Sequence, residues 1–148
     1  MRLLADTNIV LRWIETDSAE HETTVRALDK LFTQKTHVCI CAQVLVEFWV
    51  VATRPRAVNG LGLTADEAAV RLREIEETFL LLPEPSDIAK RWADIVTANS
   101  VLGKQAHDAR LVALMLSHGI SQILTLNPQD FARYPEITPL TPAEVLSL

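Results

Sequence analysis

The sequence predicts an α/β fold in which helices flank a central parallel sheet of four to five strands. Short apolar runs alternate along the chain with longer segments whose apolar residues recur at helical spacing. Capping residues, turns and prolines separate these segments. Strands that alternate with helices imply a parallel sheet covered on both faces. With 148 residues, 49% of them hydrophobic, the chain is expected to form one domain over residues 1–148.

The opening stretch predicts the first strand and the first helix. Leu3 to Ala5 form a short apolar run, and Asp6-Thr7-Asn8 follows it with residues that favour a helix start. Ligands of open α/β sheets bind outside the carboxyl ends of the strands, which is where Asp6 falls. We expect Asp6 to deliver a carboxylate to the mouth of the sheet. A simple capping role for Asp6 or Thr7 accounts for the same pattern.

The next segments predict two helices and the second strand. Asp17-Ser18 can cap a second helix, and residues 37–41 predict the second strand. Residues 43–53 predict a buried helix, because apolar residues occupy nearly all of its sides. That helix is expected to end before Arg54-Pro55, since the residue before a proline disfavours helical backbone.

The second half continues the alternation. Thr64 and Glu67 form a capping box that opens an amphipathic helix, and the apolar run 79–82 predicts the third strand. The tripeptide Pro85-Ser86-Asp87 is expected to open the next helix, and residues 106–117 predict another. The fourth strand is expected within 120–126, a short helix from Asn127-Pro128, and a fifth strand over 137–140.

Composition limits the classes of function. The net charge of −5 and the pI near 5.3 do not suit a protein that grips nucleic acid through a broad basic face. Nucleic-acid chemistry would need a local basic patch, metal ions or a partner. No apolar run reaches the roughly 18 residues of a membrane span, and no secretion signal is evident. Two closely spaced cysteines suit a reducing compartment, so we expect a cytoplasmic protein.

Four acidic residues stand where chemistry is expected. Glu47 interrupts an otherwise apolar helix, so it should be paired, metal-bound or face a cleft. The structural alternatives are a salt bridge with an arginine such as Arg12 or Arg54, or simple exposure on the one wet face of the helix. Asp108 lies near a helix start, where the helix dipole alone favours carboxylates. Asp130 follows the fourth strand, where helix capping is again an alternative. Together with Asp6, these acids are the kind of ligands that Mg²⁺ or Mn²⁺ prefers.

The ordered set Asp6, Glu47, Asp108 and Asn127/Asp130 resembles the PIN domain, and most closely the VapC toxins of bacterial toxin–antitoxin pairs. The resemblance covers essentially the full chain. Its motifs are Asp6-Thr7-Asn8 with Leu11-Arg12, Gln43-Val44-Leu45-Val46-Glu47-Phe48, His107-Asp108-Ala109, and Thr125-Leu126-Asn127-Pro128-Gln129-Asp130-Phe131. Four such motifs in this order and at these separations are specific.

The resemblance implies a PIN-like, Rossmann-like fold and the toxin component of a type II toxin–antitoxin system. It implies an endoribonuclease that depends on Mg²⁺, or on Mn²⁺, and hydrolyses RNA phosphodiester bonds with a metal-activated water. It also implies a homodimer and a cognate VapB-like antitoxin. The expected catalytic and metal-binding residues are Asp6, Glu47, Asp108 and Asp130. The expected hydrogen-bonding support comes from Thr7, Asn8, Thr125 and Asn127.

One position departs from the family pattern. Many members carry aspartate two residues after the conserved threonine, and here that position is Asn127. Asp130, one helical turn on, is expected to supply the fourth acid directly or through water, so either residue can complete the site. The expected contacts to RNA or antitoxin are Arg12, Arg54, Arg56 and Lys104.

Three alternatives stay open from the sequence. A housekeeping PIN nuclease that trims a structured RNA would have no antitoxin. A catalytically inactive PIN-like binding module is the second, and Asn127 in place of an acid is its only support. A doubly wound nucleotide-binding or receiver-like domain is the third, but the sequence has no glycine-rich phosphate loop.

Overall fold

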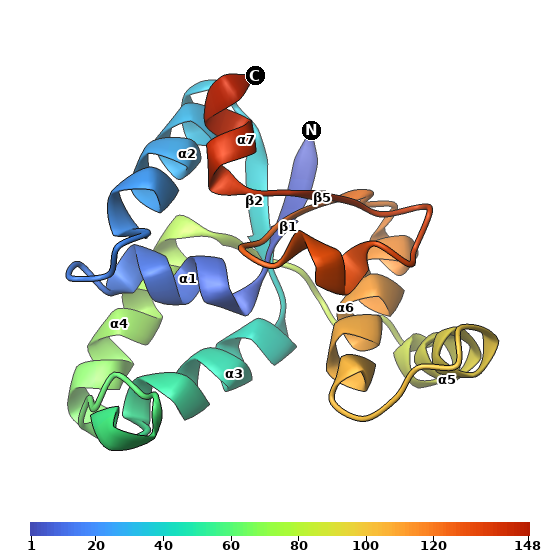
Figure 1. Ribbon diagram of the computed structural model, residues 1–148, viewed down its shortest axis with the longest axis horizontal. Helices are drawn as coiled ribbons and strands as arrows, with labels where there is room; N and C mark the ends of the chain where they lie inside the picture. Colours follow the sequence, from blue (N-terminus) through green and yellow to red (C-terminus); the bar gives the residue numbers. More distant parts are fainter.

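The computed structural model describes residues 1–148 and contains one five-stranded sheet of order β3-β2-β1-β4-β5 (Figure 1). The strands are β1 (Arg2–Ala5), β2 (His37–Ile40), β3 (Leu80–Leu81), β4 (Gln122–Leu124) and β5 (Thr138–Leu140). All four strand pairs are parallel; Leu4 of β1 pairs with Cys39 on one side and Ile123 on the other. The parallel α/β sheet predicted from the sequence is therefore confirmed.

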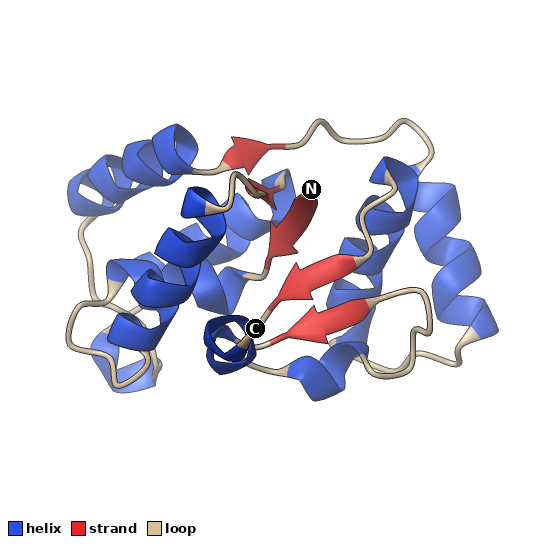
Figure 2. Cartoon of the chain, turned by 90° about the horizontal axis from the view of Figure 1, so that it is seen from above, coloured by secondary structure: helices blue, strands red, loops and turns tan.

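Seven α-helices cover the sheet. They are α1 (Thr7–Ile14), α2 (His21–Thr33), α3 (Ala42–Thr53), α4 (Ala65–Thr78), α5 (Ile88–Ala98), α6 (Gln105–His118) and α7 (Pro142–Ser147). Helices α1 to α4 lie on one side of the sheet and α5 and α6 on the other (Figures 1 and 2). Two 3₁₀ helices, η1 (Arg56–Val58) and η2 (Pro128–Phe131), lie in loops. None of the helices has the length and apolar character needed to cross a membrane.

The hydrophobic core is a single cluster of 33 buried residues centred on the middle strand. Leu3, Leu4 and Ala5 of β1 are at most 1% exposed, as expected for a central parallel strand covered on both faces. Helix α6 contributes a continuous buried stretch from Leu111 to Met115. By contrast, α5 has no buried residue and packs mainly against α6, at the outside of the molecule (Figure 1).

Two elements differ from the sequence prediction in their position or burial. The second helix begins at His21 rather than after Asp17-Ser18, because Ser18 instead bonds the side chain and backbone N–H of Glu20 in a turn. Helix α3 was expected to be buried on nearly all sides, but Val46 and Val50 are 63% and 50% exposed. Only one face of α3 packs, against α1 and α4, and the opposite face borders a cavity.

Two other elements differ in extent. The third strand was predicted over 79–82 but is limited to Leu80–Leu81, both about half exposed because β3 is an edge strand. The C-terminal helix α7 was not predicted, although Thr141 and Glu144 form a capping box at its start. It packs against α2. Neither difference moves the predicted acidic residues.

Candidate active site

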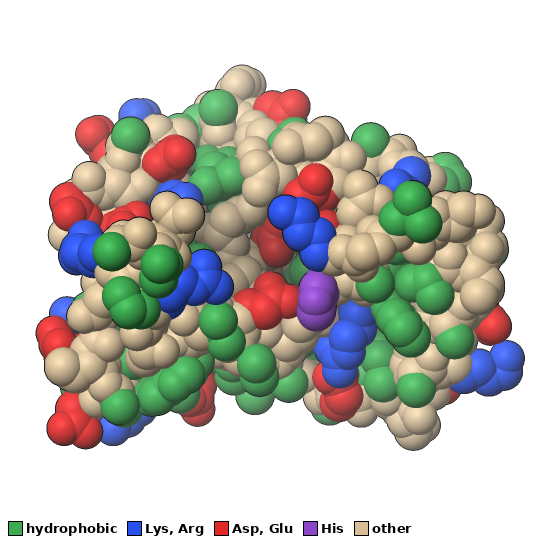
Figure 3. All heavy atoms as spheres, turned by 60° about the horizontal axis from the view of Figure 1, so that its bottom comes forward, with side chains coloured by type: hydrophobic (Ala, Val, Ile, Leu, Met, Phe, Trp, Pro, Cys, Tyr) green, Lys and Arg blue, Asp and Glu red, His purple; other side chains and the backbone are tan.

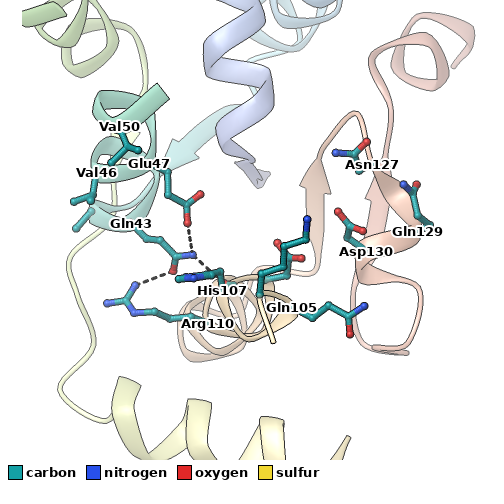
Figure 4. Close-up of a pocket in the computed structure, with 13 residues that line it drawn as sticks. Gln43, Val46, Glu47, Val50, Gln105, His107, Arg110, Asn127, Gln129 and Asp130 are labelled. Atoms are coloured by element: carbon teal, nitrogen blue, oxygen red, sulfur yellow. Dashed lines mark hydrogen bonds between the residues drawn. The ribbon is translucent and has the colours of Figure 1, made fainter. Parts of the chain in front are cut away.

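The four acidic residues predicted from the sequence converge at the carboxyl end of the sheet. Asp6 follows β1, Glu47 lies on α3, Asp108 lies in the first turn of α6, and Asp130 lies in η2. The last three line a cavity of about 890 Å³, and Asp6 lies beneath it with 8% of its surface exposed. Figure 3 shows acidic side chains gathered in a hollow of the surface, and Figure 4 shows Glu47 and Asp130 on its opposite walls.

Asp6 is held rigidly by the elements on either side of it. Its Oδ1 accepts a 2.8 Å hydrogen bond from the Thr7 N–H, and its Oδ2 accepts one of 2.8 Å from the Thr125 hydroxyl. The first bond is a helix N-cap, so the capping role and the placement at the mouth of the sheet coexist. Burial raises the Asp6 pKa to about 6; the bonds from Thr125 and Thr7 oppose this shift, and the charges of Glu47 and Asp130 add to it.

Glu47 is half-buried and bonded by neutral side chains. Its Oε2 accepts a hydrogen bond from the Thr7 hydroxyl at 2.8 Å, and its Oε1 accepts one from the Gln43 amide at 2.9 Å. It forms no salt bridge, so the predicted alternative of a pair with Arg12 or Arg54 is not found. No cationic side chain therefore pairs with Glu47 at the cavity wall.

Asp108 shows how strongly the acids affect one another. Its pKa is raised to about 7, first by partial burial and then by the charges of Asp6, Asp130 and Glu47, with Lys104 opposing the shift. A carboxylate in the first turn of a helix is normally stabilised by the helix dipole. The opposite shift means that the neighbouring negative charges and desolvation outweigh the dipole. A perturbed acid in a cleft is a mark of functional sites.

The predicted supporting residues tie α1 to the end of β4. The Asn8 side-chain oxygen accepts a hydrogen bond from the Leu126 N–H at 3.1 Å. The Thr125 hydroxyl, fully buried, donates to Asp6 and accepts from the Asn127 N–H at 3.0 Å. The Asn127 side chain itself lines the cavity, above Asp130 in Figure 4. Asn127 and Asp130 are thus both placed to face a ligand.

The predicted basic residues are only partly at the cavity. Lys104 lines it. Arg12 instead lies near Glu15 and Glu20, at 3.6 Å in both pairs. Arg54 and Arg56 follow the end of α3 and do not line the cavity.

Five polar residues that line the cavity were given no role from the sequence: Gln43, Gln105, His107, Arg110 and Gln129. Gln43 donates to Glu47 and to the His107 carbonyl at 2.8 Å, and its oxygen accepts a bond of 3.0 Å from Arg110. Arg110 also pairs with Glu84 at 2.7 Å. The sequence signal for Gln43 was its position four residues before Glu47, on the same helix face. His107 and Arg110 flank Asp108 closely enough on α6 to have been considered with it.

The chemistry of the donor set fits a hard divalent cation. All four acids offer carboxylate oxygens, and their repulsion leaves a negative charge that a cation would neutralise. No three His, Cys, Asp or Glu residues form a group close enough to hold a metal ion. Mg²⁺ commonly binds through one or two carboxylates together with waters and substrate phosphate, so it does not require such a group.

Comparisons with known proteins place this geometry in context. The family model of the PIN domain matches residues 3–137. A chain of the VapBC2 structure from Rickettsia felis has a TM-score of 0.70 at 14% identity, covering 95% of this chain and 98% of that one. A chain of the VapBC-1 structure from nontypeable Haemophilus influenzae has a TM-score of 0.67 at 13% identity, covering 97% of this chain and 99% of that one. VapC20 of Mycobacterium tuberculosis is described as a sarcin-ricin loop cleaving toxin. Its structure has a TM-score of 0.63 at 20% identity, covering 89% of this chain and 95% of that one. No curated protein matches the sequence significantly.

Proposed function

The chain belongs to the PIN domain family, and from that premise we propose that it is an endoribonuclease that depends on Mg²⁺ or Mn²⁺ and acts as the toxin of a type II toxin–antitoxin pair. The observation that carries the proposal is the convergence of Asp6, Glu47, Asp108 and Asp130 at one cavity, with raised pKa values at Asp6 and Asp108. Clustered carboxylates that perturb one another suit a metal-dependent hydrolase.

In this proposal Asp6 and Asp108 are the principal holders of the cation, and Glu47 and Asp130 complete the site. A divalent cation bound there would neutralise charge on the scissile phosphate and acidify water. Asp6 is suited to its role because two hydrogen bonds fix its oxygens before any ligand arrives. Glu47 is suited to orient a water molecule, because Thr7 and Gln43 hold its carboxylate at the cavity wall.

RNA is proposed as the substrate on grounds outside this chemistry, because phosphodiester hydrolysis by water does not require a 2′-hydroxyl. The support is the family resemblance and the similarity to VapC20, which is described as cleaving the sarcin-ricin loop. The net charge of −5 argues against a broad basic face that would bind many phosphates. Lys104 and Arg110 are the two basic side chains at the cavity. Because Arg110 is already paired with Glu84, Lys104 is the one proposed to contact phosphate.

An antitoxin and a second copy of the chain are the proposed protein partners. Several structurally similar proteins are VapBC and FitAB complexes. On this chain, Val46 and Val50 are exposed beside the carboxylates, an apolar surface that a bound protein segment would cover. Light scattering of the purified chain, alone and with the small protein encoded beside it, tests both partners: a dimer and a larger inhibited complex are expected.

The decisive experiment maps new RNA 5′ ends in cells that express the wild type, Asp6→Asn or Asp29→Asn. Asp6→Asn keeps an oxygen for the Thr7 N–H cap but loses the carboxylate, whereas Asp29 is an exposed acid on α2. Sharp cuts are expected with the wild type and Asp29→Asn only. Identical 5′ ends in all three strains, with all three proteins folded, would rule out the proposed nuclease for the RNAs of that host.

A further inference from the structure

A second hollow lies next to the carboxylate cavity, between α5 and α6. It encloses about 410 Å³ and is lined by Ile88, Ala89, Trp92, Ala106, His107 and Arg110; we call it the α5–α6 groove. Four of these six side chains are apolar, whereas the neighbouring cavity is mostly polar. The groove exists because α5 buries no residue completely and meets α6 through partly buried side chains.

The groove adjoins the candidate active site. His107 and Arg110 line both hollows, so they form the wall between them. Figure 4 shows both residues on the α6 side of the site, below Glu47. A nucleic-acid strand with one phosphate among the carboxylates would therefore place an adjacent nucleotide at the groove. Figure 3 shows a hydrophobic surface beside the acidic hollow, separated from it by basic and histidine side chains.

Two flat side chains of the groove are fixed in place. The Trp92 indole N–H donates to the Ala106 carbonyl at 2.8 Å, which sets the orientation of the ring. The Arg110 guanidinium is held by Gln43 at 3.0 Å and by Glu84 at 2.7 Å. Aromatic rings and guanidinium planes are the surfaces on which unstacked bases of single-stranded RNA pack. Because hydrogen bonds already hold Trp92 and Arg110 in place, these side chains would lose little conformational entropy when a base binds.

The negative charge of the chain favours an RNA-binding surface that does not depend on electrostatic attraction. The chain carries a net charge of −5, and the four acids of its candidate site repel phosphate until a divalent cation neutralises them. Electrostatic attraction supplies most of the affinity of ordinary nucleic-acid binding proteins, and it is weak here. Stacking of a base does not depend on the sign of the charge. Contact with a base would supply binding free energy that the phosphate groups do not.

We propose that the α5–α6 groove binds a nucleobase of the RNA substrate next to the scissile phosphate, with Trp92 and Arg110 as its contact surfaces. The proposal rests on the proposed ribonuclease function and adds to it a subsite for the base next to the cut. His107, on the shared wall, faces the nucleotide that joins the two hollows.

The test changes the groove without changing the carboxylates. Ala89 and Ala93 are both exposed on α5, but only Ala89 lines the groove, so Ala89→Glu fills it and Ala93→Glu is the matched control. Both are made in an Asp108→Asn background, which prevents cleavage, and binding of a fluorescein-labelled single-stranded RNA of mixed sequence is measured by anisotropy with Mg²⁺. Ala89→Glu is expected to weaken binding by about tenfold or more, as loss of one stacked base does. Ala93→Glu is expected to stay within about twofold.

A second readout reports on Trp92 directly. RNA binding is expected to quench the indole emission of the Asp108→Asn protein, and to quench it less after Trp92→Phe, with Trp13 and Trp49 as the constant background. Equal RNA affinity of the Ala89→Glu and Ala93→Glu proteins, or equal quenching with and without Trp92, would overturn the subsite. So would an Ala89→Glu protein that binds and cuts RNA normally but escapes inhibition by the antitoxin, because the groove would then bind protein.

The two proposals fail in different ways. If the wild type cuts RNA and Ala89→Glu cuts it at the same positions with the same KM, the ribonuclease stands and the subsite is wrong. If RNA binds in a groove-dependent way but the wild type never cuts it, the subsite stands and the ribonuclease is wrong. With a randomised RNA pool, the expected result is a modest preference beside the cut for the bases that stack most strongly, which Ala89→Glu loses and Ala93→Glu keeps.

Discussion

The Thr7 hydroxyl donates a 2.8 Å hydrogen bond to Oε2 of Glu47, and thereby joins the first turn of α1 to the middle of α3. The neighbouring Asp6 accepts a bond from the Thr7 N–H, so a single residue positions two of the four acids. These acids come from segments about forty residues apart in the sequence. The packing of α1 against α3 therefore fixes the geometry of the site as well as the core.

Thr7→Val is expected to lower activity without unfolding the protein. Valine keeps the shape of the side chain, which is only 7% exposed, but removes the hydroxyl that holds Glu47. A hydrogen bond to a charged group is worth about 1.5–3 kcal/mol, so we expect a loss of about tenfold or more in RNA cleavage rate. Thr7→Ser keeps the hydroxyl and should retain most of the activity. Equal rates for the two variants would show that Glu47 does not need this bond.

The metal-free protein is expected to become less stable as pH rises. The pKa values of Asp6 and Asp108 are raised from 3.8 to about 6 and about 7 in the folded protein. Between the unfolded pKa of 3.8 and the folded values of about 6 and about 7, the folded state therefore binds more protons than the unfolded state. The free energy of unfolding falls as pH rises through this range. Asp108→Asn removes one titrating group, so its thermal unfolding in EDTA should vary less between about pH 4 and about pH 7.

Above that range Asp108→Asn should unfold at a higher temperature than the wild type, because the wild type then carries a repelling charge that the variant lacks. Asp29→Asn, an exposed acid on α2, serves as the control and should follow the wild type. If the unfolding temperatures of the wild type and Asp108→Asn changed with pH in parallel, the acids would not repel one another in the folded protein.

A divalent cation is expected to reverse this loss of stability. Mg²⁺ or Mn²⁺ that binds only the folded protein stabilises it by about 2.7 kcal/mol at a hundred times its Kd. Because protons compete for Asp6 and Asp108, the rise in Tm on adding metal should be larger near pH 8, where these carboxyls are ionised, than at about pH 5. The rise in Tm is measured by thermal unfolding with Mg²⁺, with Mn²⁺ and with EDTA at both pH values. A rise in Tm that persists in Asp108→Asn would place the cation elsewhere.

Local signals in the sequence were sufficient for the fold and for the four acids. The alternation of apolar runs and helical segments predicted every strand, and most clearly β1 and β2, because strands inside a parallel sheet are apolar throughout. The approach of Asp6 and Asp130 followed from position, since the carboxyl ends of parallel strands meet at one edge. Glu47 and Asp108 lie on helices, and only their residue types and the family resemblance joined them to the set. Asp6 illustrates this: the residues around it predict both its cap and its place at the sheet.

Relations between distant segments were not predictable in the same way. The sequence cannot show that Gln43 links Glu47, the His107 carbonyl and Arg110, because that network depends on how α3 packs relative to α6. The exposure of Val46 and Val50 likewise depends on which side of α3 is left uncovered. Apolar residues on all sides of a helix indicate burial only when every side has a neighbour.

The loop after α3 provides a test of the fold that is independent of the site. A Cβ at Gly60 would lie 1.9 Å from the Arg54 carbonyl oxygen, and the N–H of the next residue, Leu61, bonds the Val51 carbonyl at 3.0 Å. Gly60→Ala must therefore displace backbone that holds the end of α3, and we expect it to cost about 1–3 kcal/mol of the free energy of unfolding, measured by chemical denaturation. Gly103→Ala is the comparison, because Gly103 has a φ of +55° but nothing within 4 Å of an added Cβ. It should lose only the roughly 1 kcal/mol of the left-handed conformation, and a larger loss there than at Gly60 would contradict the packing described for this loop.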